Sequence, residues 1–267
     1  MHDSTYDEMG VAEDRHWWFR AKRRIVGSLL ERYPPSTGPM GASRPLLADI
    51  GCGTGGLLRE LGDRFDTIGF DSSERALEYC RRDGLRVRPC YLPERLPLET
   101  SSVDVVVMSD VLEHLEYDAA SVKAVVERLR PGGVLICTVP AHMWLWTQHD
   151  TRLHHFRRYT KARFDAVFGG IPLRRELLSW YMFWLFPALA AERGLRRLRG
   201  ERHGEIPADG WDNPDADGTD GGGPSTAPVP APVVNAVLHA AFASERHLLG
   251  RVPLPCGASL VSVHVKA

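Results

Sequence analysis

A glycine-rich loop is the strongest chemical signal in the sequence. The run LADIGCGTGGLL places Gly51, Gly53, Gly55 and Gly56 between an apolar strand and the start of a helix. Because glycine has no Cβ atom, backbone amides in such a loop can approach a ligand at the N-terminus of the helix. The spacing fits both GxGxxG and the tighter GxGxG, so it indicates a nucleotide-like cofactor without naming it. A glycine-rich turn with no ligand is the disfavoured alternative.

Two carboxylates beside this loop narrow the choice of cofactor. Asp71 ends the strand TIGFD, about 20 residues after the first loop glycine, where a carboxylate accepts hydrogen bonds from ribose hydroxyls. Asp49 directly precedes the loop, where a dinucleotide pyrophosphate would need positive surroundings. Asp49 better matches the cationic amino group of a methionine moiety. It therefore disfavours an NAD-dependent dehydrogenase, as does the later turn LRPGG.

A second group of polar residues lies between residues 142 and 159. His149, Asp150 and His155 are the candidate catalytic residues, because an imidazole oriented by a carboxylate can act as a base near neutral pH. A capping loop, whose arginines bind backbone carbonyls, is supported equally well. The ligand spacing disfavours a metal centre built from these histidines, so no metal site is predicted.

Alternating strands and helices must position these residues. Between residues 46 and 139, short apolar runs alternate with helical patterns, which predicts an α/β fold with a doubly wound, mostly parallel sheet and helices on both faces. Strands are expected at 46–50, 66–70, 86–91, 103–108 and 133–139, and helices at 55–63, 73–83 and 118–130. The candidate residues would then meet at the carboxyl edge of the sheet.

The flanks of this core divide the chain further. Near-helical spacing of apolar residues predicts a helix over 13–32, and the apolar run at 177–191 is followed by a basic tail. The Gly-, Pro- and Asp-rich stretch at 204–232 is predicted to be disordered. We expect four parts: an N-terminal helical cap (1–40), the α/β core (41–200), the disordered loop (201–232), and a helix (233–249) and last strand (259–265) that complete the core (233–267).

Composition limits the class of protein. The 267 residues carry 33 basic and 34 acidic side chains, for a formal net charge of −1, which argues against a nucleic-acid partner. The five cysteines form no CxxC pair, and the N-terminus has no apolar signal stretch, so reduced thiols and a cytoplasmic location are expected. The run 177–191 contains Pro187 and is shorter than the roughly 20 residues of a membrane span.

Four motifs, taken together, resemble a known family. DIGCGTG, IGFD, SSVDVVVMSDVLEHL and LRPGGVLICTVP occur in the order and spacing seen in class I S-adenosylmethionine-dependent methyltransferases. The segments HWWFRAKRRIV, LWTQHDTRLHHFRRYTKARF and PLPCGASLVSV are similar to a bacterial small-molecule subgroup. The resemblance implies a Rossmann-like seven-stranded sheet, an N-terminal helical cap, a helical insertion before the last strand, and S-adenosylmethionine as cofactor.

The resemblance also implies residue roles. Glu113 and His114, in LEH, recur in the family whatever the substrate, so a structural or cofactor-proximal role is expected for both. Leu92 replaces a carboxylate that meets the adenine amino group in many relatives, which leaves a backbone group or Glu94 for that contact. The cofactor-binding residues implied are Asp49, Gly51, Gly53 and Gly55 for the methionine part, Asp71 for the ribose, and Asp110 near the sulfonium.

The expected reaction is methylation of a small-molecule acceptor, either a secondary metabolite or a lipid-linked compound. Transfer to oxygen is favoured because a cleft rich in His and Asp suits deprotonation of a hydroxyl. Two alternatives stay open: a cyclisation or elimination in natural-product biosynthesis, and a partner subunit without catalysis. HWWF (16–19) is expected to pack in the core. The run 177–191 indicates a pocket wall, a homo- or heterodimer interface, or a peripheral membrane contact.

Overall fold

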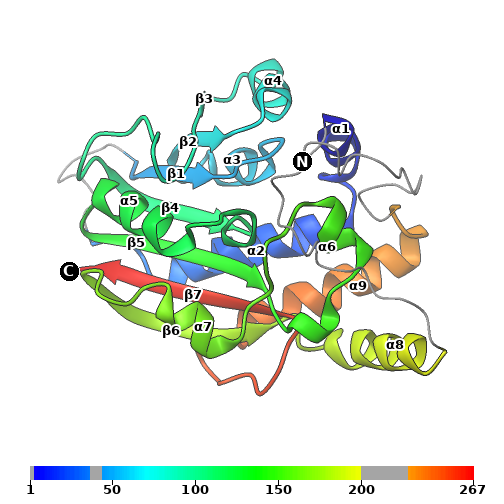
Figure 1. Cartoon of the computed structure of the whole chain (residues 1–267). Coiled ribbons are helices and arrows are strands. Elements are labelled where there is room, and N and C mark those ends of the chain that lie inside the picture. The colour runs from blue at the N-terminus through cyan, green and yellow to red at the C-terminus, as the bar shows by residue number, and fades with distance from the viewer. Residues whose placement is uncertain (1–2, 37–43, 200–227) are drawn as a thin grey trace.

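A seven-stranded sheet forms the centre of the molecule (Figure 1). The computed structural model describes residues 3–36, 44–199 and 228–267. The strand order is β3-β2-β1-β4-β5-β7-β6, and β7 alone runs opposite to the others. This confirms the predicted doubly wound, mostly parallel sheet. The strands are β1 (Leu46–Ile50), β2 (Asp66–Asp71), β3 (Val87–Pro89), β4 (Val103–Ser109), β5 (Leu129–Pro140), β6 (Leu173–Tyr181) and β7 (Ser259–Lys266).

Helices cover both faces of this sheet (Figure 1). They are α1 (Asp3–Ala12), α2 (Trp17–Arg32), α3 (Gly56–Leu61), α4 (Glu74–Arg82), α5 (Asp118–Arg128), α6 (Gln148–Arg152), α7 (Lys161–Ala166), α8 (Phe186–Leu198) and α9 (Pro232–Ser244). Three single-turn 3₁₀ helices join them: η1 (Leu112–His114), η2 (Met143–Leu145) and η3 (Glu245–His247). Of these helices, α8 and α9 lie between the two antiparallel strands β6 and β7 in the sequence, which matches the expected helical insertion.

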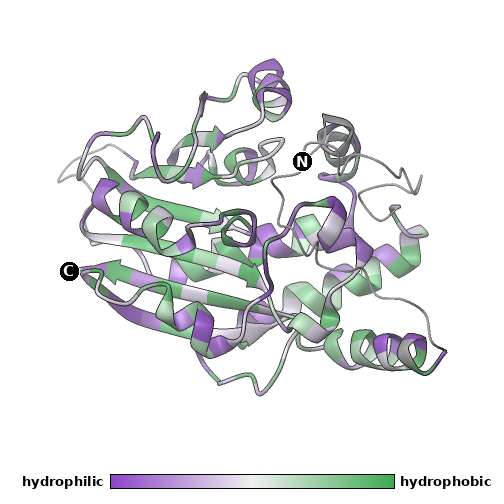
Figure 2. Ribbon diagram, in the orientation of Figure 1, coloured by the Kyte–Doolittle hydropathy of each residue, from purple (hydrophilic) through white to green (hydrophobic). Residues whose placement is uncertain are grey.

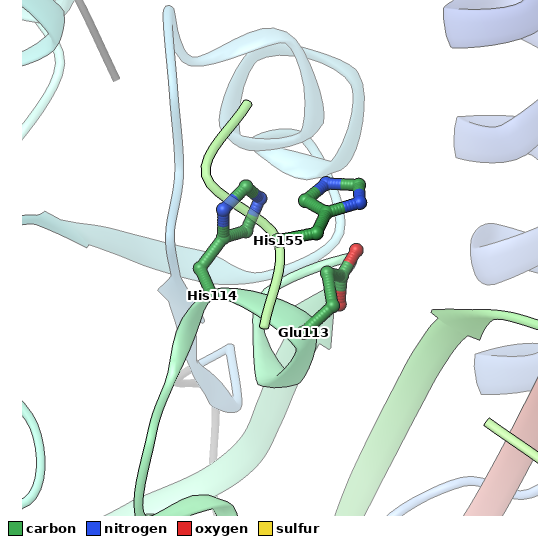
Figure 3. Close-up of side chains that lie close together, drawn as sticks. All are labelled: Glu113, His114 and His155. Carbon is green, nitrogen blue, oxygen red and sulfur yellow. The ribbon is translucent and has the colours of Figure 1, made fainter. Parts of the chain in front are cut away.

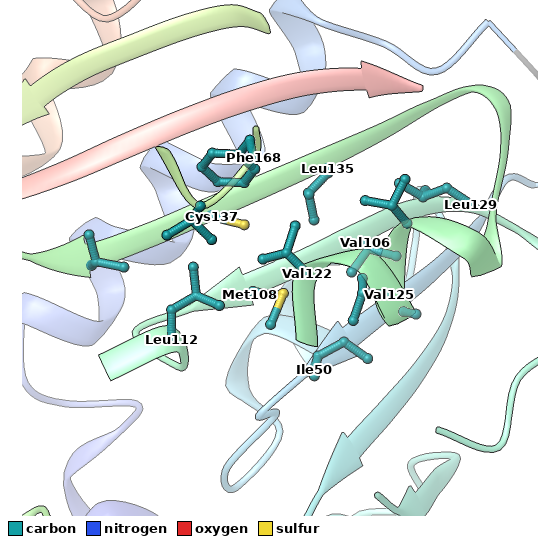
Figure 4. Close-up of a cluster of buried hydrophobic side chains, with 14 of the residues drawn as sticks. Ile50, Val106, Met108, Leu112, Val122, Val125, Leu129, Leu135, Cys137 and Phe168 are labelled. Atoms are coloured by element: carbon teal, nitrogen blue, oxygen red, sulfur yellow. The ribbon is translucent and has the colours of Figure 1, made fainter. Parts of the chain in front are cut away.

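Alternation along the central strands creates two apolar layers. Successive side chains of a strand point to opposite faces, so Val106 and Met108 pack on the α5 side while Val105 and Val107 pack on the α2 side. Figure 4 shows the first layer between the sheet and α5, and Figure 2 shows hydrophobic residues concentrated in the central strands. Because β4 is buried on both faces, it forms the rigid base of the edge where the candidate residues lie.

The N-terminal region differs from the expected single helix over 13–32. The chain forms α1 first and then starts α2 at Trp17, where the His16 ring accepts a hydrogen bond from the Trp18 amide at 3.2 Å. A side chain that accepts from the first helical turn satisfies an amide with no partner in the helix, so it fixes the start of α2. Trp17 packs edge-on against Phe242, which agrees with a core role for HWWF.

The segment after residue 171 holds a strand that the sequence analysis did not predict. Leu177, Leu178 and Tyr181 belong to β6, which pairs with β7 along its whole length. The run 177–191 is therefore part strand and part helix α8. No helix among the described residues is long and apolar enough to cross a membrane. The loop predicted at 201–232 lies mostly outside the described residues.

The strand order places a ligand crevice at one edge. The order in which the chain adds strands to the sheet reverses between β1 and β4. From β1 the chain first adds β2 and β3 on one side and then returns to add β4 and β5 on the other. In sheets of this kind, ligands bind outside the carboxyl ends of the strands at the point of reversal. The glycine-rich loop follows β1 and Asp110 follows β4, so the fold brings both to this point.

Candidate cofactor and catalytic site

The loop after β1 has the backbone shape that its glycines predict. Gly51 and Gly55 have positive φ angles of 73° and 89°, a region that side chains rarely adopt. A Cβ atom on Gly51 would lie 2.5 Å from the Val111 side chain, so the loop also needs glycine for space. Gly55 is the N-cap residue that directly precedes α3, so the loop leads straight into this helix.

Asp71 links the loop to the next strand. One carboxylate oxygen accepts the Gly53 amide at 3.0 Å, and the other accepts the Ser73 amide at 2.9 Å. The hydroxyl of Tyr6, from α1, donates to Asp71 at 3.5 Å. Burial raises the pKa of Asp71, against the lowering effect of these amide hydrogen bonds. Asp71 is thus buried at the edge of the crevice, as its predicted ribose contact requires.

Asp110 lies across the crevice at the end of β4. Its backbone adopts a positive φ of 56°, a strained value for a non-glycine residue and one often found at functional sites. The Thr138 hydroxyl donates to its carboxylate at 2.9 Å, and the Lys22 ammonium forms an ion pair with it. The same ammonium lies 4.5 Å from the centre of the Trp18 ring. Helix α2 therefore delivers a cation to the crevice, a contact that the sequence analysis did not predict.

Asp49 and Glu13 add negative charge between these two residues. Asp49 is 3% exposed, and its pKa is raised well above its usual range, first by burial and then by the charges of Glu13 and Asp71. Glu13 accepts the Gly56 amide at 3.1 Å and the Thr54 hydroxyl, so the turn after α1 closes onto the start of α3. Arg23 and Arg59 pair with Glu13, and Lys22 pairs with Asp110. Asp49 and Asp71 have no basic partner among the ion pairs of the described residues, which favours a positively charged ligand, such as a sulfonium or an ammonium group.

A hollow of about 560 Å³ opens next to Asp71. It lies between α1 and the start of α4, and its lining is Tyr6, Asp7, Ser72, Ser73, Glu74, Arg75 and Glu78. A ligand held by Asp71 could extend into this space.

Two of the three candidate catalytic residues are in contact. The His155 Nδ1 atom lies 2.9 Å from an oxygen of Asp150, which is fully buried. Arg158 donates to both oxygens of Asp150, at 2.8 and 3.0 Å. Burial alone would raise the pKa of Asp150, but the hydrogen bond from His155 and the charge of Arg158 hold it well below its usual value. Asp150 is thus an ionised carboxylate that fixes the orientation of the His155 ring.

His149 lies outside this pair. Its side chain is exposed on the short helix α6, where its backbone amide donates to the Thr147 hydroxyl at 3.2 Å. The same threonine forms a capping box with Asp150. Asp150 therefore serves as a helix cap as well as the partner of His155. Arg157 and Arg158 donate to the backbone carbonyls of Glu116 and Ala141, as the alternative of a capping loop predicts.

Glu113 and His114 join the pair from the other side. The rings of His114 and His155 meet edge to face with centroids 4.6 Å apart. The amide of Phe156 donates to the Glu113 carbonyl at 2.7 Å, which ties the loop after β5 to η1. Burial, followed by the charge of Asp110, raises the pKa of Glu113 well above its usual range. A glutamate inside a short turn gives no sequence signal of such burial.

Comparisons with known proteins agree with this arrangement. The family described as "Methyltransferase domain" matches residues 48–137, which run from β1 to β5. A probable S-adenosylmethionine-dependent methyltransferase from Mycolicibacterium smegmatis is 33% identical over 150 residues, covering 55% of this chain and 54% of the relative. A trans-aconitate 2-methyltransferase from Deinococcus radiodurans is 30% identical over 129 residues, covering 46% of each. The chain thus spans about half the length of these curated relatives.

A solved structure extends the likeness in fold over nearly the whole chain. A methyltransferase from Haloferax volcanii, solved in complex with the Trm112 methyltransferase activator, gives a TM-score of 0.56 at 18% identity and covers 98% of this chain and 96% of its own. Residues 48–137 are therefore a methyltransferase domain of the S-adenosylmethionine-dependent class that the sequence motifs predicted, and the solved structure agrees in fold. S-adenosylmethionine is the cofactor of this class.

Proposed function

We propose that this protein is an S-adenosylmethionine-dependent methyltransferase that acts on a small-molecule acceptor, with transfer to oxygen favoured. One observation carries the proposal: three carboxylates, two of them buried and the third partly exposed, lie at the carboxyl ends of β1, β2 and β4 around a glycine loop, at the point where the strand order reverses. These are Asp49, Asp71 and Asp110. A cationic cofactor with two ribose hydroxyls is the ligand whose charge and hydrogen-bonding groups match this set.

Each of these residues has a distinct part in the proposal. Asp71 accepts hydrogen bonds from the ribose, while Asp49 and the backbone of Gly51, Gly53 and Gly55 hold the methionine part. Asp110 faces the sulfonium, and Lys22 neutralises it when the crevice is empty. The hollow next to Asp71 extends the crevice towards α4.

S-adenosylmethionine, when bound, supplies an electrophilic methyl group. The protein has to align the acceptor, exclude water and remove a proton if the acceptor is a hydroxyl. His155 is the proposed base, because Asp150 holds its Nδ1 atom and so orients the imidazole ring. Asp150 is a positioning residue. His149 is exposed, so we assign it no part in proton removal; it is a candidate only for contact with the acceptor.

The acceptor class and partners belong to the same proposal. The name of the Deinococcus relative specifies a small carboxylic acid, which supports a small oxygen-bearing acceptor here. The Haloferax neighbour was solved with a protein activator, which supports a protein partner as a further proposal. In this chain the half-exposed Trp184, between β6 and α8, lies within the run 177–191, for which a protein interface was one of three alternatives, beside a pocket wall and a membrane contact.

The test is an assay of S-adenosylhomocysteine formation together with product mass, using a panel of small hydroxy and carboxylic acids. A product heavier by one methylene unit supports methyl transfer. Product formation without this gain would favour cyclisation or elimination. Failure of the protein to bind S-adenosylmethionine or S-adenosylhomocysteine would contradict the cofactor assignment and favour a non-catalytic subunit.

A further inference from the structure

We propose that Glu113, His114 and His155 form a binding site for a zinc-like divalent cation beside the cofactor crevice. Each residue offers one ligand atom, and these atoms all lie within 4.8 Å of one another (Figure 3). In a tetrahedral site, metal–ligand bonds of about 2.0–2.2 Å hold two ligand atoms about 3.3–3.6 Å apart. The side chains would therefore have to close by up to about an ångström, through small rotations, to surround an ion. The sequence analysis predicted no metal site, since sequence spacing does not bring 113–114 near 155.

The strongest support is the state of Glu113. Its side chain is fully buried, and neither carboxylate oxygen has a hydrogen-bond partner among the described residues. The two nearby cations are engaged elsewhere: Arg158 binds Asp150, and Lys22 binds Asp110. A buried carboxylate without a partner costs several kcal/mol if it is charged. A divalent cation would supply the missing partner of the Glu113 carboxylate and favour its charged form.

The two histidines are held as metal ligands usually are. Asp150 binds the Nδ1 atom of His155 at 2.9 Å and so fixes the orientation of the ring. A carboxylate that orients a histidine in this way is a common second layer of metal sites. His114 has a hydrogen bond with the backbone of Leu153.

The ligand chemistry selects the class of ion. Two imidazoles and one carboxylate are the ligands of a catalytic zinc site, which keeps a further position open for water or substrate. Imidazole nitrogen is a poor ligand for Mg²⁺ and Ca²⁺, which prefer oxygen. His114 is partly exposed, whereas Glu113 and His155 are buried, so an ion and an acceptor oxygen can reach the cluster from the His114 side.

The open position gives the cation a role that rests on the proposed function. An acceptor hydroxyl bound there would lose its proton to solvent more readily, because the cation stabilises the resulting oxyanion. The oxygen would then form the new bond to the methyl carbon as the carbon–sulfur bond breaks, leaving a neutral thioether. His155 would act as a ligand in this case and not as the base.

Metal binding can be tested without cofactor or acceptor. The chain is stripped with a chelator, titrated with Zn²⁺ against a chromophoric competitor, and analysed for bound metal by atomic emission. We expect one ion per wild-type chain, and Co²⁺ should give the visible absorption of a low-symmetry site. Glu113→Gln and His155→Asn should each weaken the affinity by at least about 100-fold, and Asp150→Asn by about 10–100-fold. His247→Asn, at an exposed histidine in η3, is the matched control and should bind like wild type.

Thermal unfolding separates loss of the site from loss of the fold. Glu113→Gln removes a buried lone carboxylate, so the metal-free variant should melt at or above the wild-type temperature. Zn²⁺ should raise the melting temperature of the wild type and of His247→Asn, but not of Glu113→Gln. Wild-type protein that binds no stoichiometric ion, or Glu113→Gln that binds as tightly as wild type, would overturn the proposal. Either result leaves the methyl-transfer proposal standing, because the titration contains no methyl donor.

Discussion

Asp71 shows how one side chain can serve both the fold and a ligand. It binds two backbone amides, of Gly53 and Ser73, which shape the loop before any cofactor is present. A carboxylate has more lone pairs than these two amides use, so it can accept further hydrogen bonds from ribose hydroxyls. The loop geometry and the cofactor contact therefore depend on the same residue.

Replacing Asp71 tests its cofactor contact. Asp71→Ala should weaken binding of S-adenosylhomocysteine by about 1.5–3 kcal/mol, the usual loss for a hydrogen bond to a charged group, or about 10–150-fold in Kd. Titration calorimetry gives the value. Asp66→Ala, at the exposed opposite end of the same strand, is the control and should leave Kd unchanged. An unaltered Kd for Asp71→Ala would refute the ribose assignment.

His264 on β7 predicts a pH dependence of stability. It is 2% exposed and stacks on Phe168 with ring centroids 4.0 Å apart, and burial, with Arg175 nearby, lowers its pKa from 6.5 to about 4. The unfolded chain therefore takes up the proton first, and stability present at neutral pH is lost as the pH falls from 6.5 to about 4. The loss due to this residue should reach about 3 kcal/mol.

The measurement is denaturant unfolding of wild type and His264→Gln between pH 4 and 7.5. The difference between their unfolding free energies should shift by about 3 kcal/mol across this range, with the wild type losing more at low pH. His247→Gln replaces an exposed histidine and should follow the wild-type curve. Parallel curves for wild type and His264→Gln would mean that the imidazole takes up its proton in the folded protein.

The sequence alone could predict the positions of some residues of the candidate site and not of others. Asp49, Asp71 and Asp110 were predictable because each ends a strand of a recognisable pattern. Lys22 was not, because it lies among other basic residues of one helix and only packing of that helix on the sheet distinguishes it. Glu113 escaped for a similar reason: burial without a partner is a property of three-dimensional surroundings.

Among the elements, the turn after α1 makes a prediction of its own. Glu13 accepts the first amide of α3 and the Thr54 hydroxyl, so it caps a helix that is distant in sequence. Glu13→Ala should lower the unfolding free energy by about 1–2 kcal/mol, since it leaves a buried amide without a partner. Burial raises the pKa of Glu13, which means that its charged form is destabilised in the folded protein. Glu13→Gln keeps an oxygen that can accept the amide of α3, so it should lower the unfolding free energy by less than Glu13→Ala does.

Asp14 is the matched control for this helix cap. It follows Glu13 directly. Both carboxylates pair with Arg23 and Arg59, but the side chain of Asp14 is 64% exposed. Exposed ion pairs contribute little, so Asp14→Ala should change the unfolding free energy by less than about 0.5 kcal/mol. Equal losses for Glu13→Ala and Asp14→Ala in denaturant unfolding would rule out the cap.

Strands with a clear apolar pattern were predicted from the sequence, whereas the edge strand β6 was not. The strands β1, β2 and β4 are apolar runs next to turn residues, so their bounds agree within one residue of expectation. β6 is an edge strand, and its half-buried leucines and aromatics suit a strand, a helix or an interface equally well. Its pairing with β7 decides the matter, and pairing between distant segments leaves no local mark in a sequence.

For the whole molecule, the crevice predicts a link between ligand binding and stability. S-adenosylhomocysteine at 100 times its Kd should raise the unfolding free energy by about 2.7 kcal/mol, which for a chain of this size is a rise of about 5–10 °C in Tm. Differential scanning fluorimetry measures the shift. At the same ligand concentration Asp71→Ala should show a much smaller rise, and an equal rise would place the ligand elsewhere.

The position of β7 has a consequence for synthesis of the chain. β7 is the last strand in sequence, yet it lies between β5 and β6, which are made earlier. On the ribosome, residues up to about Pro140 can assemble five neighbouring strands, but β6 has no partner until Ser259–Lys266 have emerged. The unfinished sheet exposes an open edge for the time needed to translate more than a hundred further residues, so nascent chains of this protein should depend on holding chaperones until residues 259–266 have emerged.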